Sequence, residues 1–344
     1  GGGNKHLMWH AHIPRLFLPL LLVVVLASCA PRFQPPGLNA DVPRRPTLTD
    51  THFLTSDGTA LPLRRWAPET PPRAVIIALH GFNDYGKAFT EIGTWLATQG
   101  VATLAYDQRG FGSSPQAGIW PGRERLVSDI HDAVSAVKDT YPDLPVFALG
   151  ESMGGGVLMV AWNRSPLDVD GLVLVAPAVL SRDTIPAYQA ASLWVLAHTM
   201  PWLSVSGQGI KRNPSDNIEM LRALGRDPLV IKHTRVDSVW GLVNLMDDAL
   251  AAASQFVAPS LFLFGANDDI VPPTASRQLL AALPKTAGAG QTIAVYPDGF
   301  HMLLRDLQSA VVWEDILTWI DDPTAPLPSG ADVSDPISAL PDLD

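Results

Sequence analysis

The sequence predicts an α/β protein with a mostly parallel sheet and helices on both faces. Short apolar runs of strand length alternate with helical stretches along most of the chain, which is the pattern of repeated βαβ units. The length of 344 residues is ample for one large domain of this class, and no second catalytic domain is needed. Several of the apolar runs end in loops that carry Ser, Asp or His.

The sheet is predicted to begin with a hairpin. Strand signals near residues 51–56 and 61–66 flank Ser56-Asp57-Gly58-Thr59, a turn sequence that favours an antiparallel pair. Apolar runs that predict further strands follow along the chain at 74–79, 145–149, 171–175, 260–264 and 292–296.

After residue 175 the alternation stops for about eighty residues. The interval of roughly 180–255 is too long for a connection and too apolar for a linker. We therefore predict an inserted helical cap. Its segment 190–203 is nearly uncharged and contains Trp194, Met200 and Trp202, so we expect it to line an acyl tunnel, to rest on a membrane or simply to pack on the core.

A candidate nucleophile follows the strand at 145–149. Gly150-Glu151-Ser152-Met153-Gly154 has the Gly-x-Ser-x-Gly pattern, in which two glycines permit a sharp turn between strand and helix. Such a turn exposes the serine hydroxyl to a base and to oxyanion donors. A phosphate-binding loop is the alternative, but Gly156 stands where that loop needs a lysine.

The candidate acid and base follow later strands, in the chain order expected for such a triad. Asp268 comes after the strand at 260–264, and a buried carboxylate there would orient an imidazole and stabilise its protonated form. The neighbouring Asp269 is the alternative acid, although we expect it to face solvent. His301 follows the strand at 292–296 and is the predicted general base.

An oxyanion hole requires two backbone N–H groups. One comes from the residue after the nucleophile, Met153, and the other from the loop after the strand at 74–79, where Phe82 is the natural donor. We interpret His80 as a brace within that loop. No zinc motif or cysteine cluster is present, so we expect no metal and no cofactor.

Together these motifs resemble the monoacylglycerol lipase and lysophospholipase branch of the α/β-hydrolases, which includes serine aminopeptidases of the S33 type. The resemblance covers roughly residues 50–320 and rests on five motifs: His80-Gly81-Phe82, Asp107-Gln108-Arg109-Gly110-Phe111-Gly112-Ser113-Ser114, the serine motif at 150–155, Gly265 with Asp268, and His301. It implies an eight-stranded sheet, a helical cap over the nucleophile and hydrolysis of single-chain lipid esters. The chain departs from the family's common His-Gly-x-Gly-Glu-His motif at Asn83, Asp84 and Tyr85.

The amino-terminal residues 1–28 resemble a bacterial lipoprotein signal peptide. Arg15 precedes an apolar run that is too short to span a bilayer, and the run ends in Leu26-Ala27-Ser28-Cys29, which is similar to the lipoprotein box. We expect Cys29, the only cysteine, to be lipidated. By the same resemblance Ala30 favours the outer membrane of a bacterial envelope. We interpret residues 1–7 as an expression remnant or an upstream start.

Composition sets the remaining expectations. Residues 29–49 are predicted to form a proline-rich tether, 50–322 the hydrolase domain, and 323–344 a disordered acidic tail without lysine or arginine. Residues 321–344 contain six aspartates, six of the net ten negative charges, and no basic aromatic stripe indicates nucleic acid. The expected partners are a small acyl ester and a membrane surface, reached through the lipid anchor and the cap.

Three functions are compatible with these features. The first is an esterase for single-chain acyl lipids, monoacylglycerols or lysophospholipids, that works through an acyl-enzyme. The second is an aminopeptidase of the same fold, which needs cap carboxylates to bind a free amino terminus. The third is a non-catalytic envelope lipoprotein.

Overall fold

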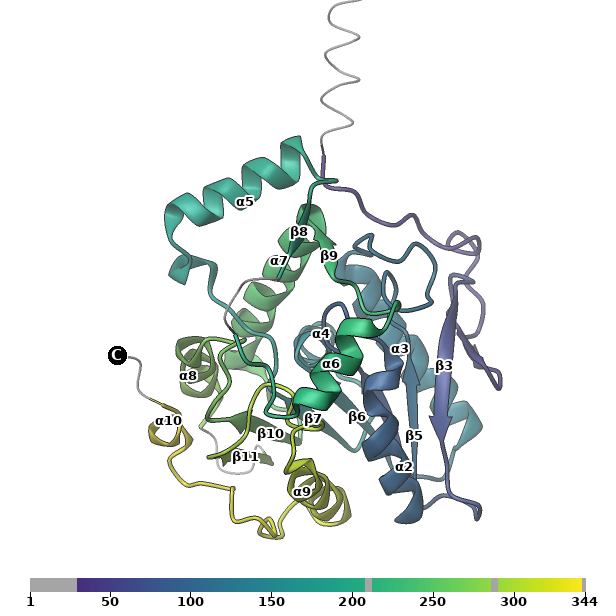
Figure 1. Cartoon of the computed structure of the whole chain (residues 1–344). Helices are drawn as coiled ribbons and strands as arrows, with labels where there is room; N and C mark the ends of the chain where they lie inside the picture. The colour runs from purple at the N-terminus through teal and green to yellow at the C-terminus, as the bar shows by residue number, and fades with distance from the viewer. Residues whose placement is uncertain (1–29, 208–211, 286–289, 342–344) are drawn as a thin grey trace, which may run out of the picture.

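A nine-stranded sheet forms the centre of the computed structural model, which describes residues 30–207, 212–285 and 290–341. The order of its strands is β1-β2-β3-β5-β4-β6-β7-β10-β11, and Figure 1 shows it enclosed by helices. The strands are β1 (Thr47–Leu48), β2 (His52–Leu54), β3 (Ala60–Trp66), β4 (Ala74–Leu79), β5 (Val101–Tyr106), β6 (Val146–Glu151), β7 (Gly171–Val175), β10 (Ser260–Gly265) and β11 (Gln291–Tyr296).

The antiparallel pairs lie at one edge of this sheet. β2 and β3 form the predicted hairpin, and β3 pairs antiparallel with β5. From β5 through β11 every pairing is parallel. The sheet has one strand more than the resemblance implied, because β1, which lies inside the predicted tether of residues 29–49, pairs with β2.

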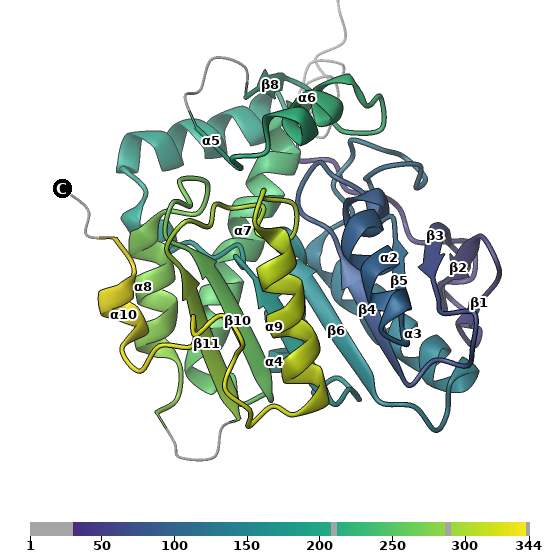
Figure 2. The ribbon, with the colours of Figure 1, turned by 60° about the horizontal axis from the view of Figure 1, so that its bottom comes forward.

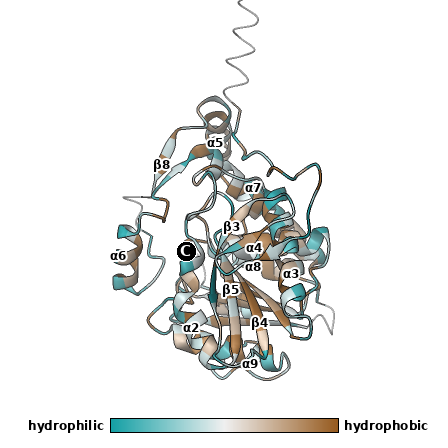
Figure 3. Cartoon of the chain, turned by 90° about the vertical axis from the view of Figure 1, so that its right-hand side faces the viewer, coloured by the Kyte–Doolittle hydropathy of each residue, from teal (hydrophilic) through white to brown (hydrophobic). Residues whose placement is uncertain are grey.

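Helices cover both faces of the sheet, so the central strands are apolar on both sides (Figure 3). On one face, Val75, Ile77 and Leu79 of β4 join a cluster with α3, α4 and α8. On the other face, Ile76 joins a cluster with α2 and α9. This two-sided burial explains the continuous apolar runs of the sequence. The helices are α2 (Thr90–Thr98), preceded by the short helix η1 (Gly86–Phe89), α3 (Arg123–Thr140), α4 (Met153–Arg164), α8 (Pro273–Ala282) and α9 (Ser309–Asp321).

A cap lies over the carboxyl ends of the parallel strands, where α5, β8 and α6 form a separate layer (Figure 2). Its elements are η2 (Arg182–Thr184), α5 (Ala187–Thr199), β8 (Ser204–Ser206), α6 (Ile218–Arg226) and β9 (His233–Arg235). β8 and β9 pair into a small antiparallel sheet.

The cap is shorter than the predicted interval of 180–255. The helix α7 (Val236–Ala252) and the turn η3 (Ala253–Gln255) belong to the core, since α7 packs against α4. Leu245 and Ala249 of α7 are fully buried in the larger cluster. The insertion therefore ends near residue 235. Apolar content alone could not separate α7 from the cap, because both are rich in apolar residues.

The predicted tether is attached to the domain rather than free. The amide of Arg32 donates to Asp237 of α7 at 3.1 Å. The buried side chain of Gln34 donates to the carbonyl of Ile119 at 2.9 Å, and the amide of Gly37 donates to Asp57. These contacts hold the proline-rich segment on the surface. The predicted signal peptide, residues 1–28, and Cys29 lie outside the described residues. Within the described ranges, no helix has both the length and the apolarity needed to cross a membrane.

The expectation of a disordered tail was wrong for residues 323–341. Asp332 forms a β-bridge with Ala294 of β11, and the amide of Val295 donates to Ala331 at 3.0 Å. Leu327 and Leu340 are each only 4 % exposed, the latter beside the short helix α10 (Pro336–Ala339). The segment covers the unpaired edge of β11. A few buried apolar side chains are enough to hold it there. Composition, averaged over the segment, did not reveal them.

A buried ion cluster fixes the hairpin turn to α3. Arg109 is 3 % exposed. Its guanidinium donates to Asp129 of α3 at 2.7 and 2.8 Å and to Asp57 of the turn at 2.7 and 2.8 Å. Burial opposes ionisation of Asp57, but hydrogen bonds from Arg109 and its neighbours outweigh burial and hold the pKa of Asp57 well below its usual range.

We expect Arg109→Met to lower the free energy of unfolding by about 3–5 kcal/mol, because it leaves the buried carboxylate of Asp129 without its cation and the half-buried carboxylate of Asp57 with only Arg125, at 3.5 Å. Chemical denaturation followed by tryptophan fluorescence measures this change. The matched control is Arg45→Met, which breaks the exposed ion pair with Asp139 and should leave stability close to that of the parent. Equal effects of the two substitutions would contradict the structural role of the cluster.

Candidate active site

Ser152 occupies a cramped turn between β6 and α4. Its backbone has φ 53° and ψ −114°, in a region that serine rarely adopts. A Cβ atom on Gly150 would lie 2.4 Å from the backbone of Gly154, and one on Gly154 would lie 2.1 Å from the carbonyl of Leu79. Only glycine fits at these two positions, as the serine motif requires. The turn lifts Ser152 clear of the strand and the helix.

The loops after β10 and β11 bring an acid and an imidazole to this serine. His301 Nε2 lies 2.9 Å from Ser152 Oγ, and His301 Nδ1 lies 2.8 Å from Asp268 Oδ2. A carboxylate at Nδ1 fixes the proton on that nitrogen and leaves Nε2 free to accept from the hydroxyl. The three predicted side chains therefore form one hydrogen-bonded chain, from Ser152 through His301 to Asp268.

The two neighbouring aspartates point to different partners. Asp268 also accepts from the amides of Ile270 and Val271 at 2.8 and 3.1 Å, which fixes its carboxylate beside His301. Asp269 instead accepts from the amide of Asn213 in the cap at 2.9 and 3.1 Å. The structure thus brings Asp268, and not Asp269, to the histidine.

The environment of His301 favours its protonated form. The imidazole is only 5 % exposed. Burial lowers the pKa of His301, but the charge of Asp268 and its hydrogen bond outweigh burial, so the pKa lies above the ordinary histidine value. The charge of Glu151 acts in the same direction as Asp268, and that of Arg305 acts against it.

The oxyanion loop, defined here as residues 80–85, passes beside the nucleophile. A Cβ atom on Gly81 would lie 3.4 Å from Ser152 Cβ. Met153 is the first residue of α4, and the first N–H groups of a helix have no partner within the helix. Phe82, the other predicted donor, follows Gly81 directly. Both candidates thus lie on backbone next to Ser152.

His80 braces the oxyanion loop from inside the protein. It is fully buried, and its Nδ1 lies 2.8 Å from the carbonyl of Gly81. Its Nε2 accepts from the amide of Gln108 at 2.9 Å. Burial lowers the pKa of His80, which favours the neutral ring that can accept this bond. These contacts are those of a structural brace.

Sequence reasoning missed a group of buried charges beside this site. Arg305 donates from Nη1 to Asp84 Oδ2 at 2.8 Å and from Nη2 to Glu151 Oε2 at 3.0 Å. We call these three side chains the Arg305 network. The only sequence signal was Glu151, an ionisable residue inside the serine motif next to a buried strand. No local pattern links it to residues 84 and 305.

The cap is hydrogen-bonded to the loop that carries His301. We call residues 297–308 the histidine loop. Four contacts join it to cap residues 214–217: Met302 N to Pro214 O at 2.9 Å, Ser215 Oγ to Asp306 at 2.6 Å, Leu307 N to Asp216 at 2.9 Å and Asn217 Nδ2 to Arg305 O at 2.9 Å. Burial raises the pKa of Asp306 to about 6. The sequence offered no sign of this contact between distant segments.

The cap also contacts the oxyanion loop. Asn83 donates from Nδ2 to Thr234 at 2.7 Å, and its carbonyl accepts from the amide of Ile231 at 3.0 Å. Tyr85 donates to Asp227 at 2.7 Å. The short helix α6 thus spans the distance between the two loops.

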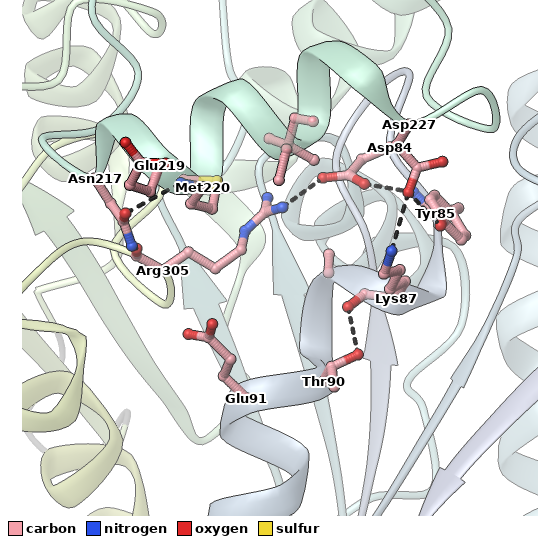
Figure 4. A pocket seen from close by; sticks show the side chains of 13 residues that line it. Asp84, Tyr85, Lys87, Thr90, Glu91, Asn217, Glu219, Met220, Asp227 and Arg305 are labelled. Atoms are coloured by element: carbon pink, nitrogen blue, oxygen red, sulfur yellow. Dashed lines mark hydrogen bonds and ion pairs between the residues drawn. The ribbon is translucent and has the colours of Figure 1, made fainter.

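A cavity of about 450 Å³ lies beneath α6, between these loops (Figure 4), and neither Ser152 nor His301 is among its lining residues. Arg305 and Asp84 form one wall, where the figure shows them paired. The other charged side chains around it are Lys87, Glu91, Glu219 and Asp227. The cavity is therefore lined by more carboxylates than cations. Among the described residues, no group of three or more His, Cys, Asp or Glu side chains is arranged to hold a metal ion.

Comparison with known proteins agrees with this architecture. The chain is 26 % identical to a monoacylglycerol lipase of Mycolicibacterium smegmatis over 80 % of its own length and 97 % of the relative's. It is 27 % identical to the human monoglyceride lipase over 80 % and 91 % of the two chains.

Solved structures show the same fold. A monoacylglycerol lipase of Paleococcus ferrophilus matches with a TM-score of 0.63 and 23 % identity over 77 % of this chain and 99 % of the other. A soluble variant of the Saccharomyces cerevisiae monoglyceride lipase, in complex with a substrate analogue, matches with a TM-score of 0.66 and 19 % identity over 86 % and 99 %. These likenesses establish an α/β-hydrolase fold.

The family model described as serine aminopeptidase, S33 (Hydrolase_4) matches residues 70–308, which include the serine turn, both later loops and the cap. The chain therefore belongs to the serine aminopeptidase S33 family of α/β-hydrolases, and it is a serine hydrolase.

Proposed function

We propose that this serine ester hydrolase cleaves the acyl ester of single-chain lipids, with monoacylglycerols as the preferred class. The observation that carries the proposal is the hydrogen-bonded row of Ser152, His301 and Asp268 beneath a cap. The similarity to enzymes named monoacylglycerol lipase supports the substrate class.

The proposed reaction passes through an acyl-enzyme. His301 Nε2 takes the proton of Ser152 Oγ as the oxygen attacks the ester carbonyl, and Asp268 stabilises the resulting imidazolium. The amides of Phe82 and Met153 hold the oxyanion of the tetrahedral intermediate. The imidazolium then protonates the leaving alcohol. Water, activated by the same imidazole, releases the fatty acid and restores the serine.

Substrate comparison tests this proposal. We expect kcat/KM for a medium-chain monoacylglycerol to exceed that for a matched short-chain ester by at least about tenfold, since each additional buried methylene contributes about 0.8 kcal/mol. We also expect it to exceed that for the corresponding lysophosphatidylcholine. Preferred cleavage of an aminoacyl amide would point instead to the aminopeptidase activity in the family description. Preferred cleavage of the short ester would remove the lipid assignment and leave an esterase.

Two substitutions test the chemistry. Ser152→Ala should abolish labelling by a fluorophosphonate and lower kcat by about 10⁴–10⁶-fold without unfolding the protein, because it removes only a hydroxyl. Asp268→Asn should lower kcat by about 10³–10⁴-fold, since a neutral amide cannot stabilise the imidazolium. Asp269→Asn is the matched control and should retain activity. If the folded parent resists the fluorophosphonate, the result favours the non-catalytic alternative.

We further propose that a lipid on Cys29 anchors the enzyme to the bacterial outer membrane. The amide of Arg32 contacts Asp237 of α7. Cys29 precedes Arg32 by three residues, so the chain between them spans at most about 10 Å. The amide of Asp237 in turn approaches the carbonyl of Pro201 at the end of α5. The exposed side chains Trp194, Trp202 and Val205 belong to this part of the cap, which lies at the top of Figure 1. The anchor would therefore bring an apolar cap surface to the bilayer.

Cys29→Ser tests the anchor. In a bacterial host that processes lipoproteins, we expect the parent to fractionate with the outer membrane and to carry acyl mass on Cys29. The variant should lose that mass and shift to the soluble fraction, because multiple acyl chains give stable anchoring and the protein surface alone gives weaker binding. The anchor is refuted if the variant fractionates with membranes as the parent does and the parent carries no acyl mass on Cys29.

A further inference from the structure

Three buried charged side chains next to Ser152 and His301 are not used by the proposed chemistry. Glu151, Arg305 and Asp84 are 2 %, 6 % and 7 % exposed. The guanidinium of Arg305 lies between the two carboxylates and binds one oxygen of each, at 3.0 Å for Glu151 and 2.8 Å for Asp84.

Each member of the Arg305 network belongs to a different part of the site. Glu151 is the residue before Ser152, Asp84 follows Phe82 by two positions, and Arg305 follows His301 by four positions, on the same loop. The network therefore ties the nucleophile, the oxyanion loop and the histidine loop together, although these segments are far apart in the chain. The backbone of Arg305 also accepts from Asn217 of the cap at 2.9 Å.

Stability alone does not account for this arrangement. Burying three charges carries a large desolvation cost, and ion pairs recover it only when every remaining polar atom is satisfied. Here Glu151 Oε1 and Arg305 Nε are buried and have no hydrogen-bond partner in the part of the chain that the structure describes. An incompletely satisfied network of two carboxylates and one cation is a poor source of folding energy.

We propose that Arg305 is a positioning residue for ester hydrolysis, which holds the serine turn and the oxyanion loop at a fixed distance from the loop that carries His301. The inference rests on the proposed ester hydrolysis and adds a residue to it. A planar guanidinium presents donors in a fixed fork, so one side chain can bind two carboxylates with defined geometry. The ammonium of lysine is a single point charge on a flexible stem and cannot hold both in the same way.

The network also contributes charge to the site. The charged groups that act on His301 are Asp268 from the loop after β10, Glu151 from β6 and Arg305 from its own loop. Asp84 pairs with Arg305. The negative charge of Glu151 raises the pKa of His301, and the positive charge of Arg305 lowers it. Replacing Glu151 by a neutral residue should therefore lower the pKa of His301, whereas Arg305→Lys keeps the local charge.

The experiment compares Arg305→Lys and Glu151→Gln with the parent on a soluble ester and on a monoacylglycerol. Active sites are counted by a fluorophosphonate so that kcat refers only to folded enzyme, and thermal unfolding is measured in parallel. Asp139→Asn serves as the control, since it neutralises a carboxylate whose ion pair with Arg45 is exposed. We expect both variants to lose between about 10-fold and 100-fold in kcat with little change in KM, as misplaced catalytic groups do. The control should match the parent.

The pH profile of kcat/KM separates positioning from charge. Activity requires neutral His301, so its acidic limb follows the pKa of His301 in the free enzyme. With Glu151→Gln the limb should move to lower pH, because the neutral form of His301 then persists to lower pH. With Arg305→Lys the acidic limb should stay at the pH of the parent, while kcat falls.

The proposal is wrong if kcat per titrated site and the acidic limb stay at the parent values in both variants, even when thermal stability falls. The network would then be structural only. If neither variant accumulates as folded protein, Asp84→Asn decides, since it leaves the pair of Glu151 and Arg305 intact: a loss in kcat supports positioning, and parent activity refutes it. A parent that labels with fluorophosphonate but cleaves no ester would refute the proposed function itself, which is a different result.

Discussion

The close packing of backbone at the turn from β6 into α4 is the constraint on which the site depends. Gly150 and Gly154 have no room for a Cβ atom, and between them Ser152 takes a backbone conformation that serine rarely adopts. This strain is compatible with folding because β6 is paired on both sides and α4 is buried against α3 and α7. The sheet thus stabilises a turn that would not form in isolation.

Because the strands are parallel, their carboxyl ends meet at one edge of the sheet. The oxyanion loop after β4, the serine after β6, Asp268 after β10 and His301 after β11 therefore converge there. The strands set the separation of these loops only coarsely, and side chains determine the remaining geometry. His80 fixes the oxyanion loop from within the core, and the amides of Ile270 and Val271 orient the acid.

The cap is hydrogen-bonded to the loops at this edge of the sheet and does not merely cover them. Residues 214–217 bind the histidine loop, and residues 227–234 bind the oxyanion loop. A shift of α6 must therefore strain the loops that hold the imidazole and the oxyanion donors. This coupling gives the cap an influence on the chemistry as well as on access, and the Arg305 network lies where the two loops and the cap meet.

The sequence by itself predicted most of the parallel strands, the serine turn and the candidate residues Asp268 and His301, although not β5 or the order of the strands in the sheet. These depend on local signals: apolar runs of strand length, glycines that a tight turn needs, and chemically reactive residues in the loops that follow. The sequence did not determine the edges of the fold. Residues 30–46 and 323–341 have the composition of linkers, yet Gln34, Leu327 and Leu340 bind them to the domain.

Only the tertiary structure decided which aspartate meets His301, where the cap ends and that Arg305 pairs with Glu151 and Asp84. Asp268 and Asp269 are identical in type and adjacent, so their roles depend on the direction in which each side chain leaves the loop. The partners of Arg305 lie more than 150 residues away in the chain. Contacts of this kind leave no periodic or local pattern, because they are made only when folding brings separate strand ends to one edge of the sheet.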